Sequence, residues 1–254
     1  MPLQIVVPMA GDGKRFQEAG YRAPKPLIPV SGVPMAVRAV QDLPRADRYV
    51  FVVRAEHVRE HGLDEVLRAH FPGCRIVAVE GVTQGQACTV ALAAPELEPD
   101  WPVIVGACDC THLYDAAQLT AILNDSTIGC CIWAYRGEAQ VLLKPAQLSW
   151  ARVANGRLLE VSCKRPLSDQ PINDLALSGF FAFRSARLML EGIEQLVASG
   201  QRVNNEFYLD SVPNLLIAQG HRAAAFEVIK YIGWGTPADL SHYQKWERYF
   251  GEHS

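Results

Sequence analysis

Short apolar runs alternate with longer segments of mixed polarity through the first half of the chain. The apolar runs have the length and the β-branched content of buried strands, and they span residues 3–8, 49–54, 75–79, 102–107 and 128–135. The segments between them have apolar residues at helical spacing, which predicts helices over residues 34–43, 56–70, 85–94 and 115–124. Because such alternation builds βαβ units, it predicts a largely parallel sheet with right-handed crossovers.

The second half of the chain has a less regular pattern. Asn155-Gly156 is a strong hairpin signal between the strand-like segments 150–154 and 158–164. Further strands are expected at residues 177–183 and 222–229, and further helices at residues 185–199, 206–219 and 237–250. No Gly- or Ser-rich linker interrupts the sequence. We therefore expect residues 1–254 to form a single α/β domain with a Rossmann-like, three-layer fold around a mostly parallel, mixed sheet.

Composition narrows the class of protein. The 254 residues carry a net charge of −3, so no strong positive field favours nucleic acid as a partner. No apolar run is long enough for a membrane span, and the first residues lack the pattern of a secretory signal. The seven cysteines are scattered and form no Cys-x-x-Cys pair, which is typical of reduced thiols. We therefore expect a cytoplasmic protein that binds neither membranes nor nucleic acids.

Residues 11–27 contain the most informative motif. Gly11 and Gly13 follow an apolar strand, and glycine lets backbone N–H groups approach a ligand closely. Arg15 and Lys25 add positive charge beside this loop, which suits the phosphates of a nucleoside triphosphate. The segment lacks the third glycine of a dinucleotide-binding fingerprint and the Gly-Lys-Ser/Thr of a P-loop, so neither of those motifs explains it.

Three loops are expected to meet at one edge of the predicted sheet. Residues 8–26, 80–85 and 108–114 each follow a predicted strand, and parallel sheets bind ligands at the carboxyl ends of their strands. Asp109 lies in the third loop. A carboxylate there suits Mg²⁺, which takes one or two carboxylates together with substrate phosphates. Asp115 is better placed to cap the helix that follows, so Asp109 is the expected metal ligand.

The order of motifs along the chain resembles the sugar-phosphate nucleotidyltransferases, also called nucleoside-diphosphate-sugar pyrophosphorylases. The resemblance starts at Gly11-x-Gly13-x-Arg15-Phe16 and Pro24-Lys25-Pro26-Leu27, and it ends at Gly235-Thr236-Pro237-x-Asp239. In that family the first loop wraps the nucleoside triphosphate, and a glutamine–glycine segment holds the nucleobase edge. The resemblance assigns about residues 1–125 to the nucleotide and about residues 126–254 to the acceptor. It implies nucleotide contacts at Ala10, Gly11, Gly13, Gln84 and Gly85.

The resemblance also implies which residues act on the reacting groups. Arg15 and Lys25 would stabilise the leaving pyrophosphate, and Asp109 would hold Mg²⁺ as the cofactor. Lys164 would orient the phosphate of the acceptor, and Gly179 belongs to a strand that lies against this second substrate. The implied reaction joins an NTP to a sugar 1-phosphate or a similar phosphate monoester. Its products are pyrophosphate and a nucleoside-diphosphate conjugate, for the synthesis of surface polysaccharide precursors.

Two positions depart from the family pattern, and each keeps an alternative open. Cys163 stands where the family has a glutamate for sugar hydroxyls. A cytidylyltransferase for a non-sugar phosphate, such as a phosphocholine-like compound, would fit this change. Gly233 stands where many members have a second metal-binding aspartate. A nucleotide-binding protein that has lost catalysis would fit the glycine at position 233.

Two further interpretations concern the end of the motif series and a rival activity. Thr236, Pro237 and Asp239 form a capping-box pattern, so Asp239 is expected to serve the start of a helix. A glycosyltransferase of similar fold would need an Asp-x-Asp metal motif, whereas the chain has Asp109-Cys110-Thr111. The nucleobase, the acceptor and the oligomeric state stay open, and a homo-oligomer is compatible with the sequence.

Overall fold

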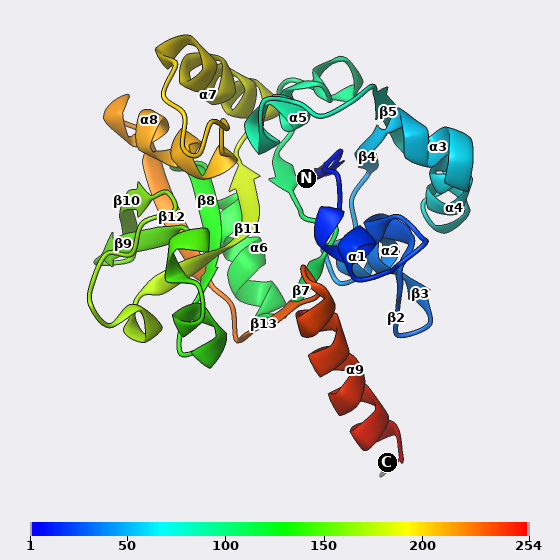
Figure 1. Ribbon diagram of the computed structural model, residues 1–254. Helices are drawn as coiled ribbons and strands as arrows, with labels where there is room; N and C mark the ends of the chain where they lie inside the picture. Colours follow the sequence, from blue (N-terminus) through cyan, green and yellow to red (C-terminus); the bar gives the residue numbers. More distant parts are fainter. Residues whose placement is uncertain (1, 253–254) are drawn as a thin grey trace.

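A mixed β-sheet of nine strands forms the centre of the part of the chain that the structure describes (Figure 1). The structure is a computed structural model that describes residues 2–252. The order across the sheet is β10-β9-β11-β6-β1-β4-β5, and β8 pairs with β11 and with β12. The strands are β1 (Gln4–Met9), β4 (Arg48–Arg54), β5 (Arg75–Val79), β6 (Val103–Val105), β8 (Ile128–Tyr135), β9 (Trp150–Ala154), β10 (Arg157–Ser162), β11 (Leu175–Phe183) and β12 (Arg222–Glu227).

The direction of the strands changes between the two halves of the chain. β1 runs parallel to β4 and to β6, and β4 runs parallel to β5, as the alternation of strands and helices predicts. β11 runs antiparallel to β6, β8 and β9, and β9 and β10 form the expected hairpin. β11 therefore joins the strands of the second half to the parallel strands of the first half within one sheet.

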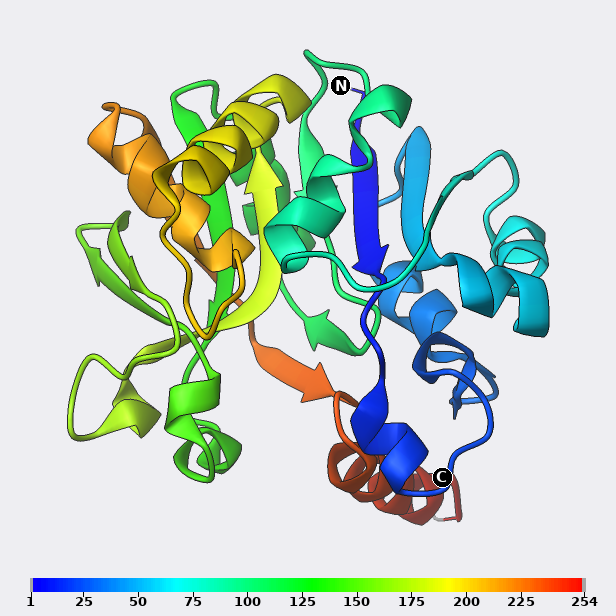
Figure 2. The same cartoon turned by 45° about the horizontal axis from the view of Figure 1, so that its top comes forward.

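Helices cover both faces of the sheet and give the molecule three layers (Figure 2). α5, α7 and α8 pack on one face, and α2, α4 and α6 pack on the other. The helices are α1 (Lys14–Glu18), α2 (Met35–Gln41), α3 (Ala55–His61), α4 (Leu63–His70), α5 (Gln86–Ala91), α6 (Ala116–Asn124), α7 (Ala186–Ser199), α8 (Val212–Ala218) and α9 (Pro237–Glu252). The expected three-layer α/β fold is confirmed. No helix within residues 2–252 has the length and apolar character to cross a membrane.

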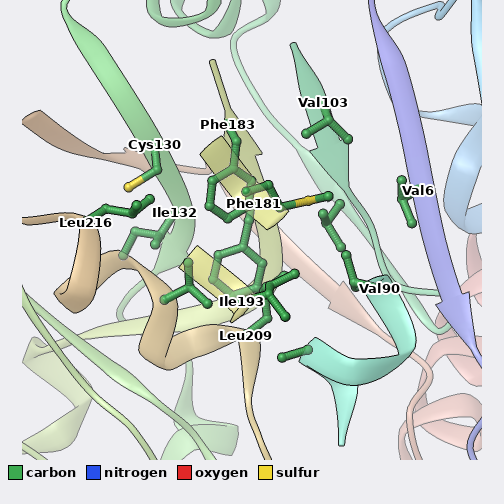
Figure 3. Close-up of a cluster of buried hydrophobic side chains, with 14 of the residues drawn as sticks. Val6, Val90, Val103, Cys130, Ile132, Phe181, Phe183, Ile193, Leu209 and Leu216 are labelled. Carbon is green, nitrogen blue, oxygen red and sulfur yellow. The ribbon is translucent and has the colours of Figure 1, made fainter. Parts of the chain in front are cut away.

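The two-residue period of the strands explains why the sheet is buried on both faces. In β8, Cys130 and Ile132 point to the face that α7 and α8 cover, whereas Cys131 and Trp133 point to the opposite face. Figure 3 shows Cys130 and Ile132 together with Phe181 of β11 in one apolar cluster. Burial of apolar side chains on both sides stabilises this strand. All seven cysteines are free thiols, as expected.

A two-stranded ribbon joins the middle of the chain to its end. β7 (Cys110–Leu113) pairs antiparallel with β13 (Lys230–Gly233), and Cys110 lies opposite Gly233. The expected loop over residues 108–114 is therefore wrong for residues 110–113, which hydrogen-bond to a strand far along the chain. After β13, the Trp234 N–H donates to the Asp109 carbonyl oxygen at 2.7 Å. The Gly-Thr-Pro segment thus lies beside Asp109, and α9 then projects from the body of the molecule (Figure 1).

Two expected helices differ from the observed ones. The segment 56–70 contains Gly62, whose φ of +59° ends α3 and starts α4 in a new direction. The segment 206–219 becomes α-helical only at Val212, and Glu206 instead forms an isolated β-bridge with Val203. A short ribbon of β2 (Pro29–Val30) and β3 (Val33–Pro34) also has no counterpart in the expected pattern. The non-helical segment before α8 contributes residues to the cleft described next.

Candidate active site

A cleft of about 760 Å³ collects charged residues from both halves of the chain. Its lining includes Arg15, Lys25 and Asp109 from the first half and Lys164 from the second. These are the four charged residues that the sequence places at the reaction site. Part of this convergence follows from topology. Arg15 follows β1 and Asp109 follows β6, and β1 and β6 are parallel neighbours whose carboxyl ends lie at the same edge of the sheet.

An ion pair holds the glycine-bearing loop in place. Arg54 ends β4, the strand beside β1, and its Nη1 donates to Asp12 Oδ1 at 2.6 Å. Burial alone would raise the pKa of Asp12, but hydrogen bonds from Arg54 and a neighbouring lysine outweigh burial and lower this pKa. Gly13 has a φ of +64°, and a Cβ at this position would lie 3.4 Å from the Lys25 Cβ. The loop therefore fixes the start of α1 close to Lys25.

Lys25 and Asp109 form an ion pair inside the cleft. Lys25 Nζ donates to Asp109 Oδ2, and the two side chains are 20% and 26% exposed. Burial would lower the pKa of Lys25, but the negative charge of Asp109 outweighs burial and raises this pKa above its ordinary value. The lysine therefore stays protonated, and its charge and that of Asp109 compensate each other. A phosphate that draws Lys25 away would free the carboxylate for a cation.

Asp109 lies beside the Gly-Thr-Pro segment in the cleft. A Cβ at Gly235 would lie 3.1 Å from Asp109 Oδ2, so the glycine keeps this side of the carboxylate open. Asp239 also lines the cleft, and its Oδ2 accepts hydrogen bonds from the Thr236 N–H at 3.1 Å and from Thr236 Oγ1 at 2.7 Å. The Asp239 N–H donates to Thr236 Oγ1 at 3.2 Å, which completes the expected capping box.

The donor set limits which metal would fit. Within residues 2–252, no group of three or more His, Cys, Asp or Glu side chains is arranged to hold a metal ion. Mg²⁺ does not need such a group, because it keeps several water ligands and binds through one or two carboxylates together with substrate phosphates. The residues present therefore fit a magnesium ion that Asp109 and the nucleotide would hold together.

Tyr231 occupies the space next to position 233. A Cβ at Gly233 would lie 2.8 Å from both Cε1 and the hydroxyl oxygen of Tyr231. The Tyr231 ring stacks on Tyr135, with ring centroids 4.5 Å apart and an angle of 7° between the planes. Burial is the largest of several effects that raise the pKa of Tyr231, so its hydroxyl stays neutral. An aromatic ring thus fills the space that an aspartate would need.

Gln84 and Gly85 lie on a loop that the second half of the chain holds. The Phe207 N–H donates to the Gln84 carbonyl oxygen at 2.9 Å, and Arg202 Nη2 donates to Gln84 Oε1. A Cβ at Gly85 would lie 2.6 Å from the backbone nitrogen and oxygen of Phe207, so close packing of two backbones requires glycine here. Gln84 is exposed at the surface, and Gly85 is buried.

The part of the cleft that comes from the second half of the chain is built around Lys164. This residue follows β10, and its Nζ donates to the Gln147 carbonyl oxygen at 2.9 Å. The ammonium also lies 4.7 Å from the centroid of the Tyr208 ring, a cation–π contact. Gly179 lies where the register of β11 shifts, with a φ of +87° and open space around its Cβ position. In the described part of the chain, the cleft lining leaves out Ala10, Gly11, Gly13, Gln84, Gly85 and Gly179.

Comparison with known families decides the class of this protein. The sequence matches the model of the MobA-like NTP transferase domain over residues 5–179, which is more than half of the chain. The chain belongs to the MobA-like NTP transferase family. The transferase is therefore a nucleotidyltransferase, and the resemblance seen in the sequence is confirmed. A search of curated proteins finds no match to the sequence.

Solved structures of related enzymes share the fold of this NTP transferase. A nucleoside-diphosphate-sugar pyrophosphorylase from Vibrio cholerae RC9 superposes with a TM-score of 0.75 at 20% identity, over 95% of this chain and 99% of that chain. The inositol-1-phosphate CTP transferase from T. maritima gives 0.73 at 18% identity, over 96% and 94%. The CMP:2-keto-3-deoxy-manno-octonic acid synthetase, complexed with CTP, gives 0.66 at 17% identity, over 98% and 99%.

Some residues that shape this cleft have little or no signal in the sequence. Tyr208 and Tyr231 line the cleft, but neither tyrosine belongs to a motif that marks a binding residue. Arg54 holds the glycine-bearing loop from a separate strand. A weak signal for Arg54 exists, because a charged residue that ends a buried parallel strand faces the ligand-binding edge of the sheet.

Proposed function

We propose that the transferase condenses an NTP with a sugar 1-phosphate or a similar small phosphate monoester. The observation that carries this proposal is the meeting of Arg15, Lys25, Asp109 and Lys164 in one cleft. Three of these residues come from the half of the chain with the glycine-bearing loop, and Lys164 comes from the other half. This arrangement suits two phosphorylated substrates that lie end to end, with the triphosphate beside α1 and the acceptor phosphate beside Lys164.

The reaction needs position and charge compensation more than it needs a protein nucleophile. An oxygen of the acceptor phosphate attacks the α-phosphorus of the NTP, and the bond from this phosphorus to the oxygen bridging to the β-phosphate breaks. Pyrophosphate leaves with the electron pair of that bond. Arg15 and Lys25 stabilise the negative charge on the pyrophosphate, and Lys164 aligns the attacking oxygen. The raised pKa of Lys25 keeps this donor charged at neutral pH.

Mg²⁺ is part of the proposal as the cofactor. It would bind to Asp109 and the nucleotide, and it would supply positive charge to the phosphates. One carboxylate alone binds Mg²⁺ weakly, so the phosphates of the nucleotide would have to supply further ligands. The chain's own contribution is to place the Asp109 carboxylate beside Lys25. Asp239 belongs to the capping box at the start of α9, so the proposal does not include it as a metal ligand.

A non-sugar acceptor is the second candidate, and the surroundings of Lys164 favour it. Position 163 is a half-buried cysteine, so it offers no carboxylate for sugar hydroxyls. The Tyr208 ring lies beside Lys164 and gives this end of the cleft an aromatic surface. An acceptor such as a phosphocholine-like compound would need the phosphate contact and an apolar wall rather than hydroxyl contacts.

One assay separates these candidates from a protein that binds nucleotide without catalysis. Each of the four common NTPs is combined with glucose 1-phosphate, inositol 1-phosphate and phosphocholine, and pyrophosphate release is measured with Mg²⁺ and with EDTA. We expect release only when NTP, acceptor and Mg²⁺ are all present. Release of orthophosphate alone, or turnover that EDTA leaves unchanged, contradicts the proposed reaction. No release with any pair supports the binding-only alternative.

Lys164→Ala tests the assignment of the two ends of the cleft. A charge-assisted contact to a phosphate contributes about 1.5–3 kcal/mol, so the KM for the acceptor should rise roughly ten- to a hundredfold while the KM for the NTP stays near the wild-type value. Arg165→Ala is the matched control, because Arg165 is the neighbouring residue and is exposed. Equal losses for both substrates would place Lys164 away from the acceptor.

The broader setting of the reaction is also a proposal. The nucleotide contacts at Ala10, Gly11, Gly13, Gln84 and Gly85, the acceptor contact at Gly179 and the division near residue 125 rest on the family resemblance. A cytoplasmic location and a role in surface polysaccharide synthesis rest on it as well. Cell fractionation tests the location, and loss of surface polysaccharide after gene deletion tests the role.

A further inference from the structure

A buried carboxylate lies directly behind the acceptor side of the cleft. Asp210 is only 5% exposed, which is unusual for a charged residue, since burying an uncompensated charge is costly. The Ser149 hydroxyl donates to Asp210 Oδ2. Lys164 Nζ lies 3.9 Å from the same oxygen. The ammonium of Lys164 is therefore the positive charge that faces Asp210.

Lys164 is held by its backbone as well as by its side chain. Its φ of +56° is in the left-handed region, which is uncommon for residues other than glycine, asparagine and aspartate. The Lys164 N–H donates to Ser149 Oγ at 3.2 Å, and this hydroxyl in turn donates to Asp210. One carboxylate thus acts on both ends of Lys164, on the ammonium through its charge and on the backbone through the serine.

We propose that Asp210 is a positioning residue that holds Lys164 in the orientation that binds the acceptor phosphate. This inference rests on the proposed function. At 3.9 Å the carboxylate attracts the ammonium without taking a short hydrogen bond from it. Of the three ammonium hydrogens, one is donated to Gln147, so donor capacity stays available to a ligand in the cleft. Asp210 itself is too buried to touch an acceptor.

The surroundings of Asp210 are rigid enough for this role. Leu209 and Val212, which lie before and after Asp210 in the sequence, are fully buried in the core cluster of the sheet. α8, which starts two residues after Asp210, is tied to the β10 strand by Asn214, which accepts from the Val161 N–H and donates to the Val161 carbonyl oxygen, both at 2.8 Å. The carboxylate and the strand that leads to Lys164 therefore belong to one connected unit.

Asp210→Asn tests the proposal, because it keeps the shape of the side chain and removes the charge. The KM for the best acceptor among glucose 1-phosphate, inositol 1-phosphate and phosphocholine should rise about tenfold, with the KM for the NTP within about twofold of wild type. Asp210→Glu should recover part of the loss. Asp100→Asn is the matched control, because that carboxylate is 81% exposed and pairs with Arg187 on another face.

A double-mutant cycle shows whether Asp210 acts through Lys164. In a Lys164→Ala background, Asp210→Asn should have little further effect on the acceptor KM, because the residue that it positions is absent. Additive losses in the double variant would overturn the proposal. If Asp210→Asn does not fold, Ser149→Ala takes its place in the cycle, since it cuts the link between Asp210 and the Lys164 backbone.

Chemical labelling makes this test independent of the proposed reaction. The rate at which acetic anhydride modifies Lys164 is read by mass spectrometry, with the exposed Lys245 on α9 as internal reference. Release of Lys164 from Asp210 should make it react faster in Asp210→Asn than in wild type, while Lys245 is unchanged. An unchanged Lys164 rate overturns the positioning role. Faster labelling in a protein that turns over no acceptor would keep the positioning role and reject the proposed reaction.

Discussion

At the scale of single residues, Arg15 and Lys25 line the same cleft in different settings. Arg15 is exposed on α1, and Lys25 is paired with Asp109. We expect Arg15→Ala and Lys25→Ala each to lower kcat by roughly 10²–10³, the effect of removing one preorganised donor to developing charge. Pyrophosphate release measures this, with Arg68→Ala on α4 as the control, since Arg68 is exposed and lies outside the cleft lining. Near-wild-type turnover in either variant would remove that residue from the phosphates.

Asp109 and Asp239 should respond differently to the same substitution. Asp109→Asn removes the charge that would hold Mg²⁺, so most activity should be lost and the Mg²⁺ requirement should rise. Asp239→Asn weakens the capping box at the start of α9 and should lower the free energy of unfolding by about 0.5–2 kcal/mol. Mg²⁺ titration of activity and urea unfolding, applied to both variants, check this. An equally steep rise in Mg²⁺ requirement for Asp239→Asn would make it a metal ligand.

The residues that the sequence reveals are those whose chemistry depends on a local motif. Arg15 and Lys25 stand within one short, distinctive run, and Asp109 follows a clear strand. Tyr231 and Asp210 could not be recognised in this way. Their places beside Gly233 and Lys164 depend on contacts between segments that are far apart in the chain.

At the scale of elements, the loop before α5 contains Gly85, where close packing against another backbone segment requires glycine. A Cβ at Gly85 would lie 2.6 Å from the Phe207 backbone, so Gly85→Ala should lower the free energy of unfolding by about 3 kcal/mol or more. Gly81→Ala is the control, because Gly81 has a φ of +69° but no atom within 4 Å of its Cβ position, and it should cost about 1–2 kcal/mol. Urea unfolding of both variants measures the difference. Equal losses would mean that backbone conformation alone, rather than the contact with Phe207, requires glycine at 85.

The elements that could be predicted are those with a strong local period. The strands of the first half appear where apolar runs predict them, because most of them are buried on both faces, and β5 at the edge of the sheet is still partly buried. The β7–β13 ribbon could not be predicted, since each strand has only four residues and its partner is distant in sequence. The break at Gly62 is a different case, because a single glycine within a helical pattern can either be tolerated inside one helix or mark the end of a helix.

At the scale of the whole molecule, His112 makes stability depend on pH. It is 6% exposed among aromatic rings, and burial lowers its pKa from 6.5 to about 3. Between these values the unfolded chain binds a proton that the folded chain does not, so stability falls as pH falls below 6.5, by up to about 1.4 kcal/mol per pH unit.

His112→Phe should remove this part of the pH dependence. Between pH 7 and pH 5, wild type should lose about 2 kcal/mol more in the free energy of unfolding than the variant. Urea unfolding of both proteins at the two pH values measures the difference, and the wild-type protein at pH 7 gives the common reference. The same loss in both proteins would show that other groups cause the acid sensitivity.

The stacked tyrosines beside Gly233 restrict which side chains this position could gain by mutation. Gly233→Asp alone would push a Cβ to within 2.8 Å of the Tyr231 ring. Truncation of Tyr231 alone would leave a gap against Tyr135, whose ring now lies flat on it. A side chain at position 233 therefore needs a second change at Tyr231, and the change at Tyr231 disturbs the packing of Tyr135. The shape of two neighbouring rings thus keeps position 233 small.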